Sequence, residues 1–195
     1  MELINAPVVG LVGCAAGGLE KLASKLVEPA LGHGLRVTVT LTPTAQTWLD
    51  ATAEVDRLKE LTGLPVRHNL GCHGKTSPYP KVDCYAVVPA TANTVAKMAQ
   101  GIADNQALTQ VCEAIGLGEV PVVVFPRVNA GHANHPAWDG HIATLTRAGV
   151  RMVMGEDIWP LHKPRSSPGK ELPWGAILDA IVSAVEGRAL TSTRR

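Results

Sequence analysis

Net charge, aromatic residues and long apolar runs are all scarce in this 195-residue chain, whose formal net charge is +1. A nearly neutral chain lacks the basic excess typical of proteins that bind nucleic acids or membrane surfaces, so we expect no partner of either kind. The N-terminus has no basic segment, and no apolar run is long enough to span a bilayer. We therefore expect a cytoplasmic protein.

Cysteine is also sparse, and its four positions show no CxxC or other zinc-type spacing. Structural zinc sites and disulfide frameworks depend on such spacing, so we expect no metal site. Hydrophobic residues, by contrast, make up 46% of the chain, which is enough at this length to bury a substantial core. We expect a single domain over residues 1–190 and a disordered tail over residues 191–195.

Short apolar segments alternate with helical patterns along the chain. Strands are predicted over residues 7–12, 35–41, 82–88, 120–125 and 150–154, with a short edge strand at 65–66. Helices are predicted over residues 19–31, 51–61, 94–103, 106–115, 136–148 and 174–185, with another opening at Pro43. Residues 155–173 are predicted to form a flexible flap. The alternation is typical of a single three-layer α/β/α domain with a doubly wound, mostly parallel sheet of flavodoxin-like or Rossmann-like type.

The first predicted strand runs into a glycine-rich turn, Gly13 to Gly18. A strand, a glycine turn and a helix form the first unit of many nucleotide- and flavin-binding sheets. The turn does not match GxGxxG, and such turns also join strands to helices purely for packing, so both interpretations stay open. Thr42 would lie beside this turn, although capping of the helix that opens at Pro43 would also explain it.

The end of the central predicted strand is the strongest candidate for a ligand site. In an open α/β sheet, ligands bind where a strand ends and a helix begins. Ala90, Thr91 and Ala92 are small enough to let a flat ligand approach the backbone. Hydrogen-bonding groups at the following helix N-terminus, which favours anions, are supplied by Thr91, Asn93 and Thr94.

Two polar loops are further candidates. The loop before the central strand holds His73 and Lys75, and the loop after the next long strand carries Arg127, Asn129 and His132. Catalytic and binding residues are often found on loops that a rigid scaffold positions. Reactive residue types also occur on ordinary surface loops, so both interpretations stay open on the residues alone.

The central segment also carries a family resemblance. Its sequence Pro89-Ala90-Thr91-Ala92-Asn93-Thr94, followed by Lys97 and Gly101-Ile102-Ala103-Asp104-Asn105, resembles the PASANT region of the homo-oligomeric flavin-containing cysteine decarboxylases. Thr42-Pro43-Thr44-Ala45 resembles another segment of that family. The similarity spans about residues 7–154, and it implies that the protein binds FMN.

In such proteins FMN lies at the carboxyl edge of the sheet. The resemblance implies that the backbone N–H groups of Gly13, Cys14 and Ala15, together with the hydroxyl of Thr42, hold its phosphate. The residues that would border the flavin are Ala90, Thr91, Ala92, Asp104 and Asn105. Family members assemble as trimers or multiples of trimers, so the resemblance also implies a homo-oligomer.

The family's reaction is the flavin-dependent oxidation of a cysteine-type CH2–SH group to a thioaldehyde, after which the neighbouring carboxylate is lost. By resemblance, His73 or Lys75 is the candidate base, and Asn93 and Asn129 are the other candidate catalytic residues. The loop around His73 is shorter than in the family. The predicted flap contains no cysteine to return electrons to the product, so oxygen is the expected oxidant of the reduced flavin.

The substrate clamp of the family, P-x-M-N-x-x-M-W, reads Pro-Arg-Val-Asn-Ala-Gly-His-Ala here, from Pro126 to Ala133. Asn129 is kept, whereas the methionines and the tryptophan are not. Arg127 and His132 would instead line a polar pocket that suits an anionic substrate. This departure argues against a housekeeping phosphopantothenoylcysteine decarboxylase.

The leading prediction is an FMN-dependent oxidative decarboxylase that acts on a cysteine-derived thiol carboxylate, such as a peptide C-terminal cysteine. Three alternatives stay open: an FMN enzyme of the same scaffold with a non-thiol substrate, a phosphopantothenoylcysteine decarboxylase, and a non-catalytic flavin-binding regulatory subunit. The expected partner is a small-molecule or peptide substrate.

Overall fold

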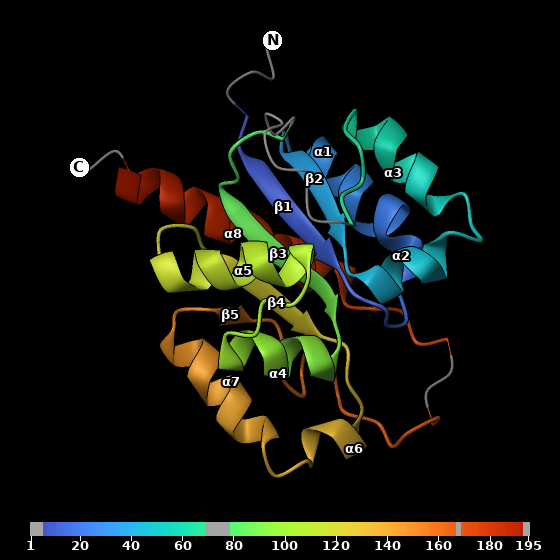
Figure 1. The fold of residues 1–195 in the computed structure, drawn as a ribbon, viewed down its shortest axis with the longest axis vertical. Coiled ribbons are helices and arrows are strands. Elements are labelled where there is room, and N and C mark those ends of the chain that lie inside the picture. Colours follow the sequence, from blue (N-terminus) through green and yellow to red (C-terminus); the bar gives the residue numbers. More distant parts are fainter. Residues whose placement is uncertain (1–5, 69–78, 167–168, 193–195) are drawn as a thin grey trace.

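The computed structural model describes residues 6–68, 79–166 and 169–192. A five-stranded sheet crosses its centre in the order β2-β1-β3-β4-β5, and every pair of neighbouring strands is parallel (Figure 1). The strands are β1 (Val8–Gly13), β2 (Arg36–Leu41), β3 (Cys84–Ala90), β4 (Val122–Pro126) and β5 (Arg151–Met152). The predicted α/β fold with a doubly wound parallel sheet is confirmed.

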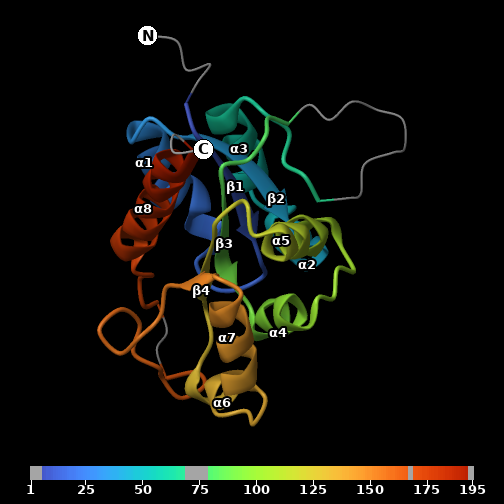
Figure 2. The same ribbon diagram turned by 90° about the vertical axis from the view of Figure 1, so that its left-hand side faces the viewer.

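Helices cover both faces of this sheet, as Figure 2 shows for α1 and α8 on one side and for α4 and α5 on the other. The first layer comprises η2 (Leu19–Lys21), η3 (Ala23–Val27), α1 (Glu28–Gly32), α2 (Pro43–Leu49), α3 (Glu54–Thr62) and α8 (Trp174–Ser192). The second layer comprises α4 (Ala92–Gln100), α5 (Gln106–Leu117) and α7 (Trp138–Arg147), with the short α6 (Ala130–Ala133) beside α7.

The central strands are apolar on both faces because both faces are covered. In β1, Val9 and Leu11 belong to the core beneath the first layer, whereas Val12 belongs to the core beneath the second. Successive side chains of a strand point to opposite faces, so one continuous apolar run serves both cores. This arrangement is why the short apolar runs predicted the strands well.

Several boundaries differ from the predicted ones. The predicted helix over residues 19–31 is built from a 3-10 turn, a π-helical turn and an α-helical turn in succession. The predicted edge strand at 65–66 is a single bridge between Thr40 and Arg67. The closing helix, predicted to end at residue 185, continues to Ser192, and the polar loop after β4 contains α6.

The segment predicted as a flexible flap is anchored to the core at two points. Trp159 and Leu172 are both buried, and the Trp159 ring meets the Phe125 ring edge-on, with 5.8 Å between the centroids. The described part of this segment therefore contacts the core through these two residues, although most of its other residues are exposed. Within residues 6–68, 79–166 and 169–192, no helix has both the length and the apolar character needed to cross a membrane.

Candidate functional site

The carboxyl ends of β1, β2 and β3 frame a cavity of about 410 Å³. Three helices begin at its rim, and the N-cap residue of each one lines it: Thr42 for α2, Thr91 for α4 and Asn105 for α5. The volume lies within the range of roughly 300–1,000 Å³ that is usual for small-molecule sites. This edge is where parallel α/β sheets bind ligands, as the sequence predicted.

Each of these N-caps is made by a side-chain oxygen. The Thr91 hydroxyl accepts a hydrogen bond from the Thr94 N–H at 3.1 Å. The side-chain oxygen of Asn105 accepts one from the Leu108 N–H at 3.1 Å, and the Thr42 hydroxyl accepts one from the Ala45 N–H at 3.3 Å. The helix N-termini therefore stay at the cavity wall, where their dipoles favour a negatively charged group.

Cys14 lines the cavity, and its side chain makes a contact that the sequence did not predict. Its backbone N–H donates a hydrogen bond to the Pro89 carbonyl at 3.2 Å, and this bond competes with the predicted contact to a phosphate. Its sulfur instead accepts a hydrogen bond from the Thr94 hydroxyl at 3.4 Å. Burial raises the pKa of the Cys14 thiol to about 11, which keeps the thiol protonated. Ala15 lines the cavity, and no described residue accepts a hydrogen bond from its N–H.

Gly13 is explained by packing. A Cβ added there would lie 2.8 Å from a Leu41 side-chain carbon and 2.9 Å from one of Leu19, so any larger residue requires these buried side chains to shift. Its carbonyl accepts a hydrogen bond from the Thr42 N–H at 3.0 Å. Gly13, Ala90 and Ala92 are not among the residues that line the cavity, so their contacts with FMN stay a prediction.

A cation and an anion face each other at the cavity rim. Lys97 donates a hydrogen bond to the Asp104 carboxylate, and this bond is the main reason that the Asp104 pKa lies below its usual value. The side-chain amide of Asn105 donates a hydrogen bond to the other oxygen of the Asp104 carboxylate, at 3.0 Å. The sequence assigned Asp104 and Asn105 to the site but not Lys97. Helical spacing could have found Lys97, because it lies four residues after Asn93, which also lines the cavity.

Arg127 occupies a separate position at the end of β4. Its backbone N–H donates a hydrogen bond to the Ala90 carbonyl at 2.8 Å. The carbon of its guanidinium group lies 4.7 Å from the centroid of the Trp159 ring. The Lys170 ammonium lies 4.4 Å from the same centroid. The Arg127 Nε is buried and has no hydrogen-bond partner among the described residues. Burial also lowers the pKa of the guanidinium.

Arg127 and Lys170 line a smaller cavity of about 120 Å³, together with Gly17, Gly18 and Lys21. The wall also carries the two carboxylates of Glu20 and Glu171, and Glu171 is paired with Lys21. Arg127 makes no salt bridge among the described residues. A partly buried, unpaired cation beside an aromatic ring is a suitable place for an anionic group of a ligand.

The remaining predicted site residues are not gathered at the 410 Å³ cavity. The Asn129 side-chain oxygen accepts a hydrogen bond from the His132 N–H at 3.1 Å and caps α6, while His132 itself is exposed. Neither residue lines that cavity, and nor does Arg127. His73 and Lys75 lie outside the described residues. The structure therefore brings together the predicted cofactor end of the site but not the predicted clamp.

Comparison with known proteins agrees with this geometry. A family model described as Flavoprotein matches residues 13–186. The chain belongs to the flavoprotein family. This membership confirms, at the level of the family, the resemblance to flavin-containing decarboxylases that the central segment predicted.

Solved structures with the fold of this flavoprotein include two decarboxylases. It aligns with the FMN-dependent cysteine decarboxylase SpaF at a TM-score of 0.68 and 22% identity, over 96% of this chain and 99% of the other. It aligns with the cypemycin decarboxylase CypD at a TM-score of 0.68 and 20% identity, over 97% and 98% of the two chains. At such identities the likeness establishes the fold.

Curated relatives match over shorter stretches. The flavoprotein is 32% identical over 113 residues to the coenzyme A biosynthesis bifunctional protein CoaBC of Thermococcus kodakarensis, which is 58% of this chain and 27% of the relative. It is 38% identical over 71 residues to a cysteine/cysteine sulfinic acid decarboxylase of an unknown prokaryotic organism, which is 36% of this chain and 19% of the relative. The matched stretches thus span about a fifth to a quarter of these relatives.

Proposed function

We propose that this flavoprotein binds FMN in the 410 Å³ cavity and oxidatively decarboxylates a cysteine-derived thiol carboxylate, such as the C-terminal cysteine of a peptide. The observation that carries the proposal is the convergence of the capped N-termini of α4 and α5 on one cavity at the carboxyl edge of a flavoprotein sheet. The names of its relatives and structural neighbours, several of which are cysteine decarboxylases, support the choice of reaction.

The residues at the cavity suit the two parts of FMN. The Ala15 N–H, the N-terminus of α4 and the hydroxyls of Thr42 and Thr44 would hold the phosphate. Thr91, Asp104 and Asn105 would border the flavin. When bound, FMN supplies a two-electron oxidation of a CH2–SH group to a thioaldehyde, from which the neighbouring carboxylate leaves as CO2.

The chain itself would orient the substrate. Arg127 and Lys170, on the Trp159 ring, would bind the substrate carboxylate, and the buried ring would keep water from that end. Asn93, exposed at the cavity wall, would contact the reacting end. His73 and Lys75 remain the candidate bases, and Asn129 and His132 the candidate contacts at the rim.

We also propose that the protein works in the cytoplasm as a homo-oligomer of three subunits or a multiple of three. One structural neighbour, an FMN-dependent Ubix-like decarboxylase from Escherichia coli O157:H7, is described as dodecameric, and it aligns at a TM-score of 0.57 and 20% identity. Twelve is a multiple of three, which supports the proposal. Sedimentation analysis of the purified protein tests it.

A second candidate is an FMN enzyme with a non-thiol anionic substrate. The observation that favours it is that the Asn129 side-chain oxygen is occupied in capping α6, whereas the Arg127 Nε has no hydrogen-bond partner among the described residues. An arginine binds a carboxylate whether or not the substrate carries a thiol. The two candidates therefore differ in the reacting group and not in the anion.

The absorption spectrum tests the cofactor, because purified protein that is colourless and does not bind added FMN contradicts the proposal. Anaerobic mixing with matched peptides ending in cysteine or serine tests the reaction. We expect flavin bleaching and loss of CO2 and two hydrogens with the cysteine peptide only. Bleaching by a carboxylate without a thiol, and not by the cysteine peptide, would favour the second candidate.

A further inference from the structure

One lysine in the wall of the 410 Å³ cavity has no part in the reaction proposed above. Lys97 lies on α4, and among the described residues that line this cavity it is the sole cation. The sole anion among them is Asp104, which precedes the N-cap of α5 and accepts a hydrogen bond from Lys97. The charge that this wall presents to a ligand therefore depends on how these two groups are arranged.

The turn after α4 brings the two residues together. The helix ends at Gly101, whose φ of 70° lies in the left-handed region that favours glycine. The Ile102 N–H donates a hydrogen bond to the Lys97 carbonyl at 2.9 Å. The chain therefore doubles back over the last turn of α4, and Asp104 comes to lie beside the Lys97 side chain.

The cation is the more buried member of this pair. The Lys97 side chain is 25% exposed and the Asp104 side chain 49%. The Asp104 carboxylate also accepts a hydrogen bond from the Asn105 amide, and the N-terminus of α5 beside it favours a negative charge. The Lys97 ammonium has three N–H donors, and among the described residues only Asp104 accepts from them. Two of its donors are therefore available to a ligand in the cavity.

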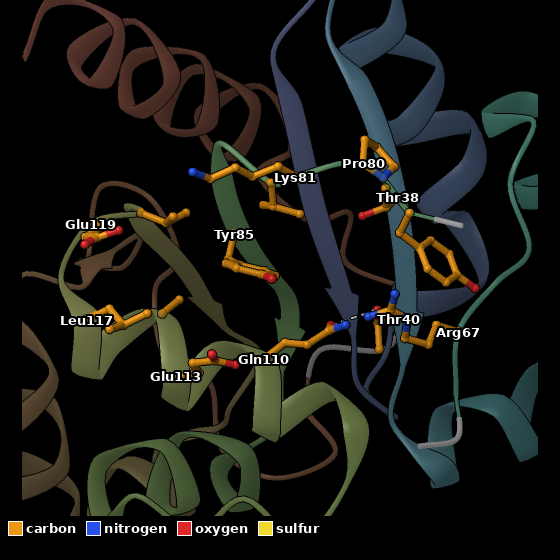
Figure 3. A pocket seen from close by; sticks show the side chains of 14 residues that line it. Thr38, Thr40, Arg67, Pro80, Lys81, Tyr85, Gln110, Glu113, Leu117 and Glu119 are labelled. Atoms are coloured by element: carbon orange, nitrogen blue, oxygen red, sulfur yellow. Dashed lines mark hydrogen bonds between the residues drawn. The ribbon is translucent and has the colours of Figure 1, made fainter. Parts of the chain in front are cut away.

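The charges of the other large cavity belong to a different part of the protein. That cavity lies between β2 and α5 and has a volume of about 320 Å³ (Figure 3). Its charged lining residues are Arg67, Lys81, Glu113 and Glu119. None of its described lining residues lines the 410 Å³ cavity. Lys81 is therefore a matched lysine, because it lines a cavity but not the proposed FMN site.

The position of Lys97 on α4 points to the flavin rather than to the phosphate. The N-terminus of α4, which is proposed to hold the phosphate, follows the N-cap residue Thr91. Lys97 comes six residues later, about 9 Å along the helix axis at a rise of 1.5 Å per residue. Its hydrogen bond to Asp104 directs the ammonium toward the segment before α5, which is proposed to border the flavin.

The proposed reaction creates a negative charge at the flavin. Oxidation of CH2–SH to CH=S removes two electrons and two protons; FMN takes both electrons and one proton, and the second proton leaves to water. Reduced FMN then carries one more negative charge than oxidised FMN, and a fixed cation stabilises such a charge. We propose that Lys97 is this cation and that Asp104 holds it in place and moderates its charge. This inference rests on the proposed binding of FMN in the 410 Å³ cavity.

The midpoint potential of bound FMN tests this inference without any substrate. An anaerobic reductive titration against a reference dye gives the potential, and a fluorescence titration gives the Kd of oxidised FMN. In K97M, reduced FMN should bind about tenfold more weakly relative to oxidised FMN, which lowers the midpoint potential by about 30 mV for a two-electron couple. K97R keeps the positive charge and should restore most of the potential.

D104N should change the potential in the opposite direction. Removal of the carboxylate leaves the Lys97 charge without its counter-ion, so reduced FMN should bind about threefold more tightly relative to oxidised FMN, which raises the potential by about 14 mV. Asp104 is half-exposed, so D104N tests the inference even where K97M fails to fold. The matched controls, K81M and E119Q, change exposed residues that do not line the 410 Å³ cavity and should leave the potential unchanged.

The outcomes that contradict this inference differ from those that contradict the proposed function. Equal weakening of both redox forms in K97M would assign Lys97 to the phosphate, and shifts of the same sign in K97M and D104N would make the pair structural. Either result, or an unchanged potential in K97M, would overturn the inference while FMN binding stands. Protein that binds no FMN would overturn the proposed function and this inference with it.

Discussion

Replacing Arg127 by methionine separates a binding role from a structural one. The variant keeps an unbranched side chain against the Trp159 ring but removes a partly buried cation whose Nε has no hydrogen-bond partner among the described residues. Loss of the cation–π contact lowers the free energy of unfolding by about 0.5–2 kcal/mol. Removal of a partly buried charge that makes no salt bridge raises it and offsets this loss. We therefore expect the free energy of unfolding to change by no more than about 1 kcal/mol.

Substrate turnover should respond much more strongly. A hydrogen bond between a charged group and its partner contributes about 1.5–3 kcal/mol. Its loss should lower kcat/KM for a carboxylate substrate by roughly 10- to 150-fold. Anaerobic flavin bleaching gives the rate, and urea unfolding gives the stability. R147M, which changes an exposed arginine on α7, is the matched control and should leave both unchanged.

The opposite pattern would refute the reasoning. If R127M lost more than about 2 kcal/mol of stability while kcat/KM stayed the same, Arg127 would be a structural residue. A K170M variant separates the two cations on the Trp159 ring. Lys170 is exposed, so its effect on kcat/KM should be smaller than that of Arg127 and should shrink further at high salt.

Three other outcomes are expected. G13A should lose about 1–3 kcal/mol in urea unfolding, because its Cβ would overlap Leu41 and Leu19. T91A should lose about 1 kcal/mol from the α4 cap and bind FMN more weakly in a fluorescence titration, whereas T52A, outside the cavity, should keep FMN affinity. The buried Cys14 thiol has its pKa raised from 9.0 to about 11, so the unfolded chain loses this proton first as pH rises. Stability should fall between about pH 9 and 11, by roughly 3 kcal/mol from this group, and less in C14A.

The parts of the site that local rules govern were predictable from the sequence. Thr42 followed by Pro43 is a helix start that depends only on neighbouring residues, and the structure confirms both its cap and its place at the cavity. The strands were predicted because continuous apolar runs reflect burial on two faces. Lys97 was missed although helical spacing from Asn93 places it at the same cavity.

The parts that depend on distant residues were not predictable. The Cys14 N–H is occupied by the Pro89 carbonyl, and this bond forms only because β1 and β3 are neighbours in the sheet. Arg127 meets Trp159, which comes from a segment that composition predicted to be a flexible flap. Prolines, glycines and charged residues interrupt that segment, so its single buried indole gave no periodic signal.

The contrast between Asn129 and Arg127 shows why a retained motif residue is weak evidence for a retained role. Asn129 matches the family clamp, yet its side-chain oxygen caps α6, a task that Ser, Thr or Asp would also perform. Arg127 matches nothing in the clamp, yet its Nε is one of two buried side-chain polar atoms that lack a partner among the described residues, and the only donor of the two, since the other is the side-chain oxygen of Gln46. A buried, unsatisfied donor is costly unless a ligand completes it. We therefore expect substrate specificity to be more sensitive to Arg127 than to the residue that the motif retains.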